Sequence, residues 1–322
     1  MSGGWNTIES DAGVFTSLIE SLGVKDVQCE ELLALDAEEL LALQPLYGVI
    51  FLFKYPTDGP YADASGPLDG RFDHDAAQDL FFAAQTIQNA CATQALLSVL
   101  LNQAGSGDGA IDVGAELASF REFGMPLPPE FRGEALSNSE LIRGAHNSFA
   151  RSSPFADETQ RAGAEPEDAF HFVAYTPVAG VLYELDGLQP APISHGPCAA
   201  GEFPAKVVDV LRRRVARYEQ SEIRFNLLAM CRDLRIRARE FGDAELVERE
   251  DSKRRTWMVE NALRRHNFVG FAGEMLKQVI GDVLEKRGEP GVAAWVQDGL
   301  ERRRAEERSS SARKKGDDRM EE

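Results

Sequence analysis

The amino-acid sequence predicts a mixed α/β (α+β) fold, with a central, mostly antiparallel sheet flanked by helices and a small all-helical C-terminal unit. The clearest observation is a hairpin pattern: AFHFVAY (169–175) and VLYELDG (181–187) are rich in strand-forming residues and flank a turn that contains proline and glycine. In addition, apolar residues repeat at helical spacing in several segments before and after this hairpin. Residues 257–296 repeat the helical pattern without any strand signal.

The individual elements follow from periodicity and from helix-start and helix-stop signals. YGVIFLFK (47–54) is a continuous apolar run typical of a buried strand, and 222–230 is a strand that closes the sheet. Ser137 precedes Glu140 by three residues, the spacing of a capping box at a helix start. We expect helices at residues 11–22, 30–43, 91–102, 114–124, 137–151 and 203–218. We expect loops at 55–70 and 152–168, the second an exposed crossover loop.

Four parts of the chain are expected from these patterns. Residues 5–228 form the larger, α/β domain, and 229–256 form a charged helical linker. Residues 257–299 form a helical C-terminal domain, in which Gly288 and Pro290 interrupt the helix. Residues 300–322 are charged and almost free of apolar residues, so we expect a disordered tail.

Composition restricts the class of protein. The chain has 322 residues, of which 43% are apolar, enough for one sizeable domain and a smaller one. It contains no apolar run of about 20 residues and no secretory signal, so we expect no membrane partner. Its four cysteines form no CxxC pair, which argues against a disulfide framework and favours a reducing compartment.

Charge is distributed unevenly. The net charge is −18, with −21 in residues 1–200 and +3 in residues 201–322. An acidic first half disfavours direct binding of nucleic acid, which needs Lys and Arg. It suits a basic protein substrate attracted by charge, but an acidic surface that only keeps the protein soluble explains it as well.

Cys91 lies at or beside the N-terminus of the helix predicted at 91–102. Unpaired backbone N–H groups and the helix dipole favour negative charge there, and the thiolate is the nucleophilic form of cysteine. On this stretch alone, a small apolar residue that begins a buried helix is an equally good interpretation. Asn89 either shapes the approach to Cys91 or caps the helix.

The predicted hairpin supplies a base and an orienting group. If its loop comprises residues 177–180, His171 lies directly opposite Asp186, with Cβ atoms about 5 Å apart. Asp186 then fixes the tautomer of His171, which takes the proton of Cys91 and later protonates the leaving amine. Gln85 is a candidate oxyanion donor. Taken singly, these residues are more often structural, and their joint occurrence is what favours a thiol-dependent hydrolase.

The other histidines and cysteines show neither metal-ligand spacing nor a nearby base. We therefore expect structural or surface roles for them, and neither a metal nor a cofactor. They are His74, His146, His195, His266, Cys29, Cys198 and Cys231.

These motifs resemble those of the ubiquitin carboxyl-terminal hydrolases, a family of papain-like cysteine proteases. The resemblance covers about residues 5–228 and includes GVIFLFKY, NACATQALLSVLLN with the upstream Gln85, NSFAR, DAFHFVAY and LYELDGL. It implies a papain-like, knotted α/β fold and hydrolysis at the C-terminal glycine of ubiquitin. It also implies Cys91 as nucleophile, His171 as general base and acid, Asp186 as orienting residue and Gln85 in the oxyanion hole. The ubiquitin tail would pass under the crossover loop.

The segment RRHNFVGFAGEMLKQV (264–279) resembles the C-terminal domain of the long, proteasome-associated branch of this family. The resemblance implies that residues 257–322 dock to the ubiquitin receptor of the proteasome's regulatory particle, in the cytoplasm and the nucleus. The same branch also associates with a chromatin-remodelling complex. One departure is that the charged segment before Trp257 is shorter than the coiled-coil region of that branch.

We therefore expect a cysteine-type ubiquitinyl hydrolase, a deubiquitinase that binds ubiquitin and its conjugates and edits ubiquitin chains at the proteasome. The alternative is a catalytically silent ubiquitin-binding scaffold or adaptor of the proteasome or of a chromatin-remodelling complex. The presence of Gln85, Cys91, His171 and Asp186 together favours the enzyme.

Overall fold

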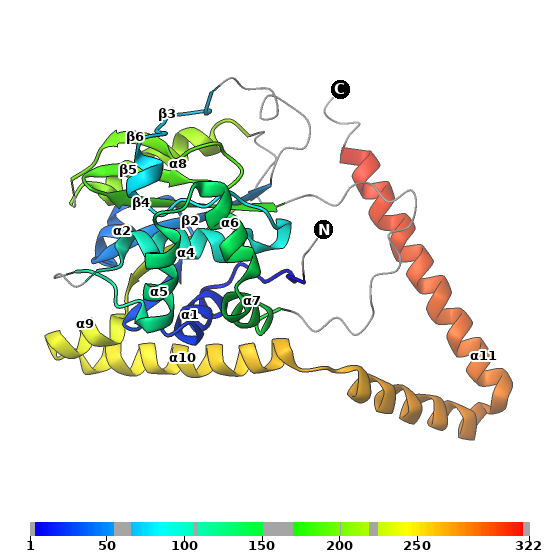
Figure 1. The fold of residues 1–322 in the computed structure, drawn as a ribbon. Coiled ribbons are helices and arrows are strands. Elements are labelled where there is room, and N and C mark those ends of the chain that lie inside the picture. The colour runs from blue at the N-terminus through cyan, green and yellow to red at the C-terminus, as the bar shows by residue number, and fades with distance from the viewer. Residues whose placement is uncertain are drawn as a thin grey trace. The chain divides into compact units, whose positions relative to one another are not determined.

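A seven-stranded sheet organises the chain as far as His266 (Figure 1). The computed structural model describes residues 4–54, 66–105, 109–150, 170–199, 201–218 and 225–317, without the side chains of Gln88 and 303–317. The strand order is β1-β7-β2-β4-β5-β6-β3, and every neighbouring pair is antiparallel, as predicted. The strands are β1 (Val27–Glu31), β2 (Leu46–Lys54), β3 (Arg71–Phe72), β4 (Phe170–Val178), β5 (Val181–Leu185), β6 (Ile193–Pro197) and β7 (Asn226–Arg232).

Helices flank this sheet and continue beyond it. They are α1 (Ala12–Ser21), α2 (Ala37–Ala42), α3 (Ala76–Asp79), the 3₁₀ helix η1 (Gln88–Ala90), α4 (Cys91–Gln103), α5 (Gly114–Gly124), α6 (Pro129–Asn138), α7 (Glu140–Asn147), α8 (Phe203–Val215), α9 (Leu234–Phe241), α10 (Ala244–Arg265) and α11 (Val269–Asp317). Among the described residues, none of these helices is both long and apolar enough to cross a lipid bilayer.

Each face of the sheet packs into its own hydrophobic core. One core contains Leu100 of α4 together with Ile50 of β2, and the other contains Leu211 of α8 together with Phe51 of β2. Neighbouring residues of β2 alternate between the two cores because successive side chains of a strand point to opposite faces. Helix α4 is buried along most of its length, with its polar side chains gathered among apolar ones.

The hairpin of β4 and β5 differs from the predicted one in its register. Its loop has two residues rather than four: Val178 pairs with Val181. Ala179 and Gly180 both adopt positive φ, 49° and 77°, as a two-residue type I′ turn requires. The predicted direct pairing of His171 with Asp186 is therefore wrong by two residues. A shift of two, unlike a shift of one, leaves both side chains on the same face of the sheet.

Two predicted helices have other boundaries. The predicted helix 30–43 begins inside β1, which includes Glu30 and Glu31, and only Ala37–Ala42 is helical. The pairing of β1 with the distant β7 overrides local helix propensity. The predicted helix 137–151 is instead divided into α6 and α7. Ser139, not Ser137, is the N-cap of α7, and its hydroxyl accepts the N–H of Ile142 at 3.3 Å.

The segment predicted as a linker, 229–256, is packed rather than free. Residues as far as Arg232 belong to β7, and α10 lies against α1. Trp257 occupies the space where a Cβ on Gly13 of α1 would lie, and Asn261 donates to the Gly13 carbonyl at 3.1 Å. The first compact unit of the structure accordingly extends to His266.

The second compact unit begins at Asn267 and contains α11. Its helix turns at Gly288, which has a non-helical φ of 66° and ψ of −175°, two residues before Pro290. This break was predicted. The backbone is helical to Asp317, since Arg, Ala and Glu are good helix formers, and the disordered tail expected at 300–322 stays a prediction. Of the loop predicted at 55–70, residues 55–65 lie outside the described residues, and residues 66–70 form neither helix nor strand. The loop predicted at 152–168 lies wholly outside the described residues.

A buried arginine holds the segment of chain that leads to α4. Arg132 of α6 is 2% exposed, and burial lowers its pKa. Its guanidinium donates to five backbone carbonyl oxygens at 2.5–3.2 Å, those of Ala77, Leu80, Phe82, Gly124 and Met125. These bonds stand in for the lost hydration of the charge and connect α3 and the residues after it to the end of α5.

We predict that Arg132→Ala lowers the free energy of unfolding by about 3 kcal/mol or more, because several buried carbonyls lose their donor. Urea denaturation followed by circular dichroism measures this change. The control is Arg239→Ala on the exposed side of α9, which should change the free energy of unfolding by less than about 0.5 kcal/mol. Similar small effects of both substitutions would contradict the anchoring role of Arg132.

Candidate active site

Cys91 is the first residue of α4, as predicted, and is 9% exposed. The 3₁₀ helix η1 leads directly into α4, and the N-cap residue Ala90 has no hydrogen-bonding side chain. The free amide groups of the first turn therefore place positive potential near the thiol. Asn89 does not cap the helix: its Nδ2 donates to the carbonyl of Trp5 at 3.0 Å, so the capping alternative is wrong.

A stripe of polar side chains on the buried helix α4 holds the segment that precedes Cys91. Asn102 donates to the carbonyl of Phe81 at 2.9 Å and accepts the Phe81 N–H at 2.7 Å. Gln94 donates to the carbonyl of Ala83 at 2.5 Å. These bonds satisfy an extended backbone that lies beside α4 and fix the path of the chain towards Gln85 and Cys91.

His171 and Asp186 form a buried charged pair. His171 Nε2 donates to Asp186 Oδ1 at 2.6 Å, and the two residues are only 3% and 2% exposed. The same oxygen accepts the N–H of Leu188 at 3.0 Å. Although the hairpin register differs from the predicted one, the two side chains still meet, because Asp186 follows the last residue of β5 near the start of β4.

Each charge of this pair stabilises the other. Burial acts to lower the pKa of His171, but the carboxylate of Asp186 and hydrogen bonds to Asp186 and Cys91 outweigh burial and raise that pKa to about 9. Burial acts to raise the pKa of Asp186, and the His171 cation, its hydrogen bond and the Leu188 N–H together hold that pKa below its usual value. At neutral pH the pair is an imidazolium and a carboxylate.

Cys91 completes a group of three, because its thiol lies beside His171 and acts to raise the pKa of the imidazole. His171 uses Nε2 for Asp186, so Nδ1 is the nitrogen that faces the sulfur. A cationic imidazole and the helix N-terminus both place positive potential beside Sγ. The arrangement provides a nucleophile, a proton donor next to it and a carboxylate that orients the donor, which is the requirement for acyl transfer through cysteine.

Gln85 is tied to the residue that follows Asp186. Its backbone N–H donates to the carbonyl of Gly187 at 2.7 Å. A Cβ on Gly187 would lie 2.1 Å from Nε2 of Gln94 and 3.0 Å from Cβ of Gln85, so only glycine allows this approach. The structure thus places Gln85 against the loop after β5, next to the residue that follows Asp186.

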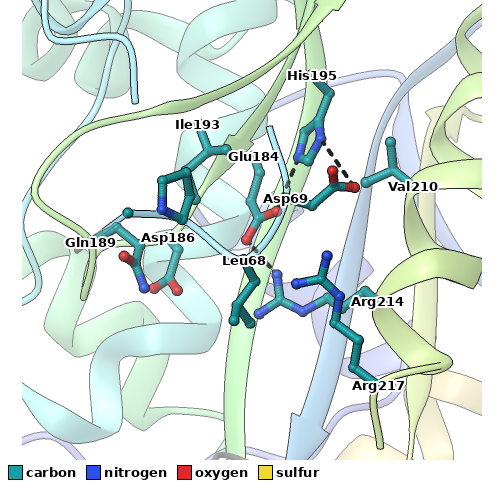
Figure 2. Close-up of a pocket in the computed structure, with 12 residues that line it drawn as sticks. Leu68, Asp69, Glu184, Asp186, Gln189, Ile193, His195, Val210, Arg214 and Arg217 are labelled. Atoms are coloured by element: carbon teal, nitrogen blue, oxygen red, sulfur yellow. Dashed lines mark hydrogen bonds and ion pairs between the residues drawn. The ribbon is translucent and has the colours of Figure 1, made fainter. Parts of the chain in front are cut away.

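The remaining predicted residues lie elsewhere. His146 is buried, and its Nδ1 contacts Thr93 Oγ1 at 2.7 Å; burial lowers its pKa, which fits a structural role. His195 lies with Asp69, Glu184 and Arg214 around a cavity of about 50 Å³ that Asp186 also lines (Figure 2). Cys29, Cys198 and Cys231 are buried thiols away from this chain of groups, and burial raises the pKa of each.

Sequence reasoning missed the residues that position the site. Gln94, Ser98 and Asn102 follow Cys91 at intervals of three or four residues along an otherwise apolar helix. This pattern is visible in the sequence and predicts hydrogen-bond partners for these side chains, because polar residues on a buried helix face need partners. Arg132 and Gly187 gave no such signal, since their partners are distant in sequence.

We predict that Asp186→Asn lowers the pKa of His171 from about 9 to below its ordinary value, because burial then acts without the opposing carboxylate. Since the folded-state pKa exceeds that of the unfolded chain, the pair's contribution to stability is complete below about pH 6.5 and is lost as the pH rises through about 9. The loss of stability in Asp186→Asn should shrink over that range.

NMR titration of the imidazole measures the pKa, and thermal unfolding at several pH values measures stability. Asp69→Asn is the control, because its carboxylate lies near His195 rather than His171. A wild-type midpoint below pH 7 would contradict the charged pair.

Comparison with known proteins identifies relatives along most of the chain. A family model described as ubiquitin carboxyl-terminal hydrolase, family 1, matches residues 5–216, and one described as ubiquitin carboxyl-terminal hydrolases matches residues 243–280. Ubiquitin carboxyl-terminal hydrolase 2 of Schizosaccharomyces pombe is 50% identical over 290 residues, which cover 88% of this chain and 93% of that protein. Ubiquitin carboxyl-terminal hydrolase ubh-4 of Caenorhabditis elegans is 37% identical over 312 residues, 89% of each protein.

A solved structure is similar as well. It is the crystal structure of Trichinella spiralis UCH37 bound to ubiquitin vinyl methyl ester, with 33% identity and a TM-score of 0.60 over 81% of this chain and 99% of that one. The predicted family, fold class and enzyme class are confirmed. The protein is a deubiquitinase that hydrolyses bonds at the C-terminus of ubiquitin through a cysteine thiol. The chain belongs to family 1 of the ubiquitin carboxyl-terminal hydrolases.

Proposed function

We propose that Cys91, His171, Asp186 and Gln85 carry out this hydrolysis. The observation that supports the proposal most directly is the buried hydrogen bond between His171 and Asp186, with Cys91 beside the imidazole at the N-terminus of α4. The Cys91 thiolate attacks the carbonyl carbon of the C-terminal glycine of ubiquitin, and the carbonyl oxygen takes up negative charge. His171 gives the proton on Nδ1 to the leaving amine, and a thioester between Cys91 and ubiquitin remains.

The thioester is then hydrolysed. With the amine gone, Nδ1 of His171 accepts a proton from water, whose oxygen attacks the thioester carbon and releases ubiquitin and the Cys91 thiolate. Asp186 keeps the imidazole in place and stabilises its cation through both steps. Gln85 donates its side-chain amide to the oxyanion, a type of contact that is worth about 3–4 kcal/mol of the barrier.

The alternative function is a silent ubiquitin-binding scaffold. A scaffold needs no aligned acid–base pair, whereas His171 and Asp186 retain a short buried hydrogen bond and opposite charges beside Cys91. This arrangement favours the enzyme, because a buried charged pair without a function is costly to keep.

We also propose that residues 257–322 dock the enzyme to the ubiquitin receptor of the proteasome's regulatory particle, where it edits ubiquitin chains in the cytoplasm and nucleus. The support is the match of residues 243–280 to the second family model and the exposure of large apolar side chains along α11. Exposed apolar groups in this number are typical of a protein interface. They include Phe271, Met275, Leu276, Val279 and Ile280. Association with a chromatin-remodelling complex is a further proposal, which rests on the resemblance of residues 264–279.

We predict that Cys91→Ala reduces hydrolysis of a fluorogenic ubiquitin C-terminal amide by at least about 10⁴-fold, because the nucleophile is lost. Its Kd for ubiquitin should stay within about threefold of the wild-type value, since the thiol is small and buried. Cys198→Ala, which removes another buried thiol, is the control and should retain hydrolysis. Turnover by Cys91→Ala above one per cent of wild type would refute the nucleophile assignment.

We predict that Phe271→Asp and Met275→Asp in the full-length protein abolish binding to the proteasomal receptor, because each places a charge in the apolar surface of α11. Hydrolysis of the fluorogenic amide by the free enzyme should be unchanged. Gln278→Asp adds the same charge at an exposed polar position of α11 and is the control. Pull-down of the purified receptor measures docking. Binding that survives both apolar substitutions would place the docking surface elsewhere.

A further inference from the structure

Arg214, in the last turn of α8, is a buried cation close to the active site. Its side chain is 11% exposed and forms an ion pair with Glu184 of β5. Its Nη1 also donates to the hydroxyl of Tyr175 at 2.9 Å. Burial acts to lower the pKa of Arg214, and Glu184, Tyr175 and Asp186 outweigh burial and hold that pKa well above its usual value. The group is therefore a permanent positive charge.

The aromatic ring of Phe53 lies between Arg214 and His171 and contacts both. The guanidinium carbon lies 4.4 Å from the ring centroid of Phe53, within cation–π distance. Phe53 is the cross-strand partner of His171, and the two rings meet edge to face, with centroids 5.8 Å apart and an interplanar angle of 82°. The hydrogen bond to Asp186 restrains one end of the imidazole, and the Phe53 ring restrains its tilt.

A second relation connects Arg214 with Asp186. Both residues line the cavity of about 50 Å³, and Figure 2 shows Glu184 between Arg214 and His195. Glu184 Oε2 is 3.1 Å from His195 Nε2, and His195 Nδ1 is 4.0 Å from Asp69, which pairs with Arg213. Arg217 also lines the cavity. The negative charges of Glu184 and Asp186 are thus close to each other, and Arg214 attracts both.

We propose that Arg214 is a positioning residue for ubiquitin hydrolysis: through Phe53 and through its charge beside Asp186, it holds the His171–Asp186 pair in the arrangement that serves Cys91. The inference deepens the proposed function and rests on the roles proposed for His171 and Asp186. Arg214 itself touches neither the thiol nor the bond that is cleaved, so its effect belongs to kcat rather than to ubiquitin binding.

The ion pair can be removed without leaving a buried charge. Arg214→Met alone would leave the Glu184 carboxylate without its cation, which is strongly destabilising. The double variant Arg214→Met/Glu184→Gln replaces both charged groups by neutral side chains of similar size, an exchange that proteins often tolerate. Glu184→Gln alone keeps the Arg214 charge and its contact with Phe53, and the Tyr175 hydroxyl and the charge of Asp186 remain as partners of the guanidinium. Arg213→Met, at the neighbouring half-exposed arginine, is the control for helix α8.

The test measures kcat and KM of the full-length variants with the fluorogenic ubiquitin amide, their Tm, and the NMR signal of the proton between His171 Nε2 and Asp186. The double variant should keep Tm within a few degrees and KM within twofold, while kcat falls by about 10- to 100-fold, the range caused by displacing a reacting group by up to about 1 Å. Its imidazole proton signal should shift or broaden. Glu184→Gln and Arg213→Met should keep kcat within about threefold and the signal unchanged.

Three results would overturn the proposal: a double variant with wild-type kcat, an equal loss of kcat in Glu184→Gln, or a loss of kcat with an unchanged imidazole signal. These results are distinct from a failure of the proposed function. An active Cys91→Ala would remove the roles of the site residues themselves, whereas an inactive Cys91→Ala beside a fully active double variant would remove only the role of Arg214.

Discussion

The buried hydrogen bond between His171 and Asp186 is the interaction on which the rest of the site depends. Burial on its own would favour the neutral forms of both groups, and each remains charged because the other lies 2.6 Å away. The imidazolium that results faces Cys91, where the N-terminus of α4 adds positive potential of its own. The proposed nucleophile is therefore placed by two features that arise in separate parts of the chain.

Bringing these parts together requires backbone anchors that do no chemistry. The extended segment before Cys91 is held by Asn102 and Gln94 from α4 and by Arg132 from α6. The bond between Gln85 and Gly187 then joins this segment to the loop that carries Asp186. Because each anchor satisfies buried backbone groups, the position of the site is tied to the stability of the domain. This explains why polar side chains occur on the buried helix α4.

Local signals predicted part of this arrangement. Cys91 begins α4 because the apolar period starts there, and the hairpin of β4 and β5 is visible in its own residues. The His171–Asp186 pair was predicted although the register was wrong, because an error of two residues keeps both side chains on one face. The features that the sequence did not predict depend on partners that are distant along the chain. β1 exists by pairing with β7, and Arg132 and Arg214 are buried only because carbonyls or Glu184 from other elements meet them.

The proposed chemistry depends on Cys91 as the nucleophile that attacks the C-terminus of ubiquitin. The most direct measurement treats the full-length protein with ubiquitin that carries a thiol-reactive electrophile at its C-terminus and locates the adduct by mass spectrometry. We predict one covalent ubiquitin per protein, attached at Cys91 and formed faster than adducts of the small electrophile alone. An adduct at Cys29, Cys198 or Cys231, or no adduct at any cysteine, would contradict it.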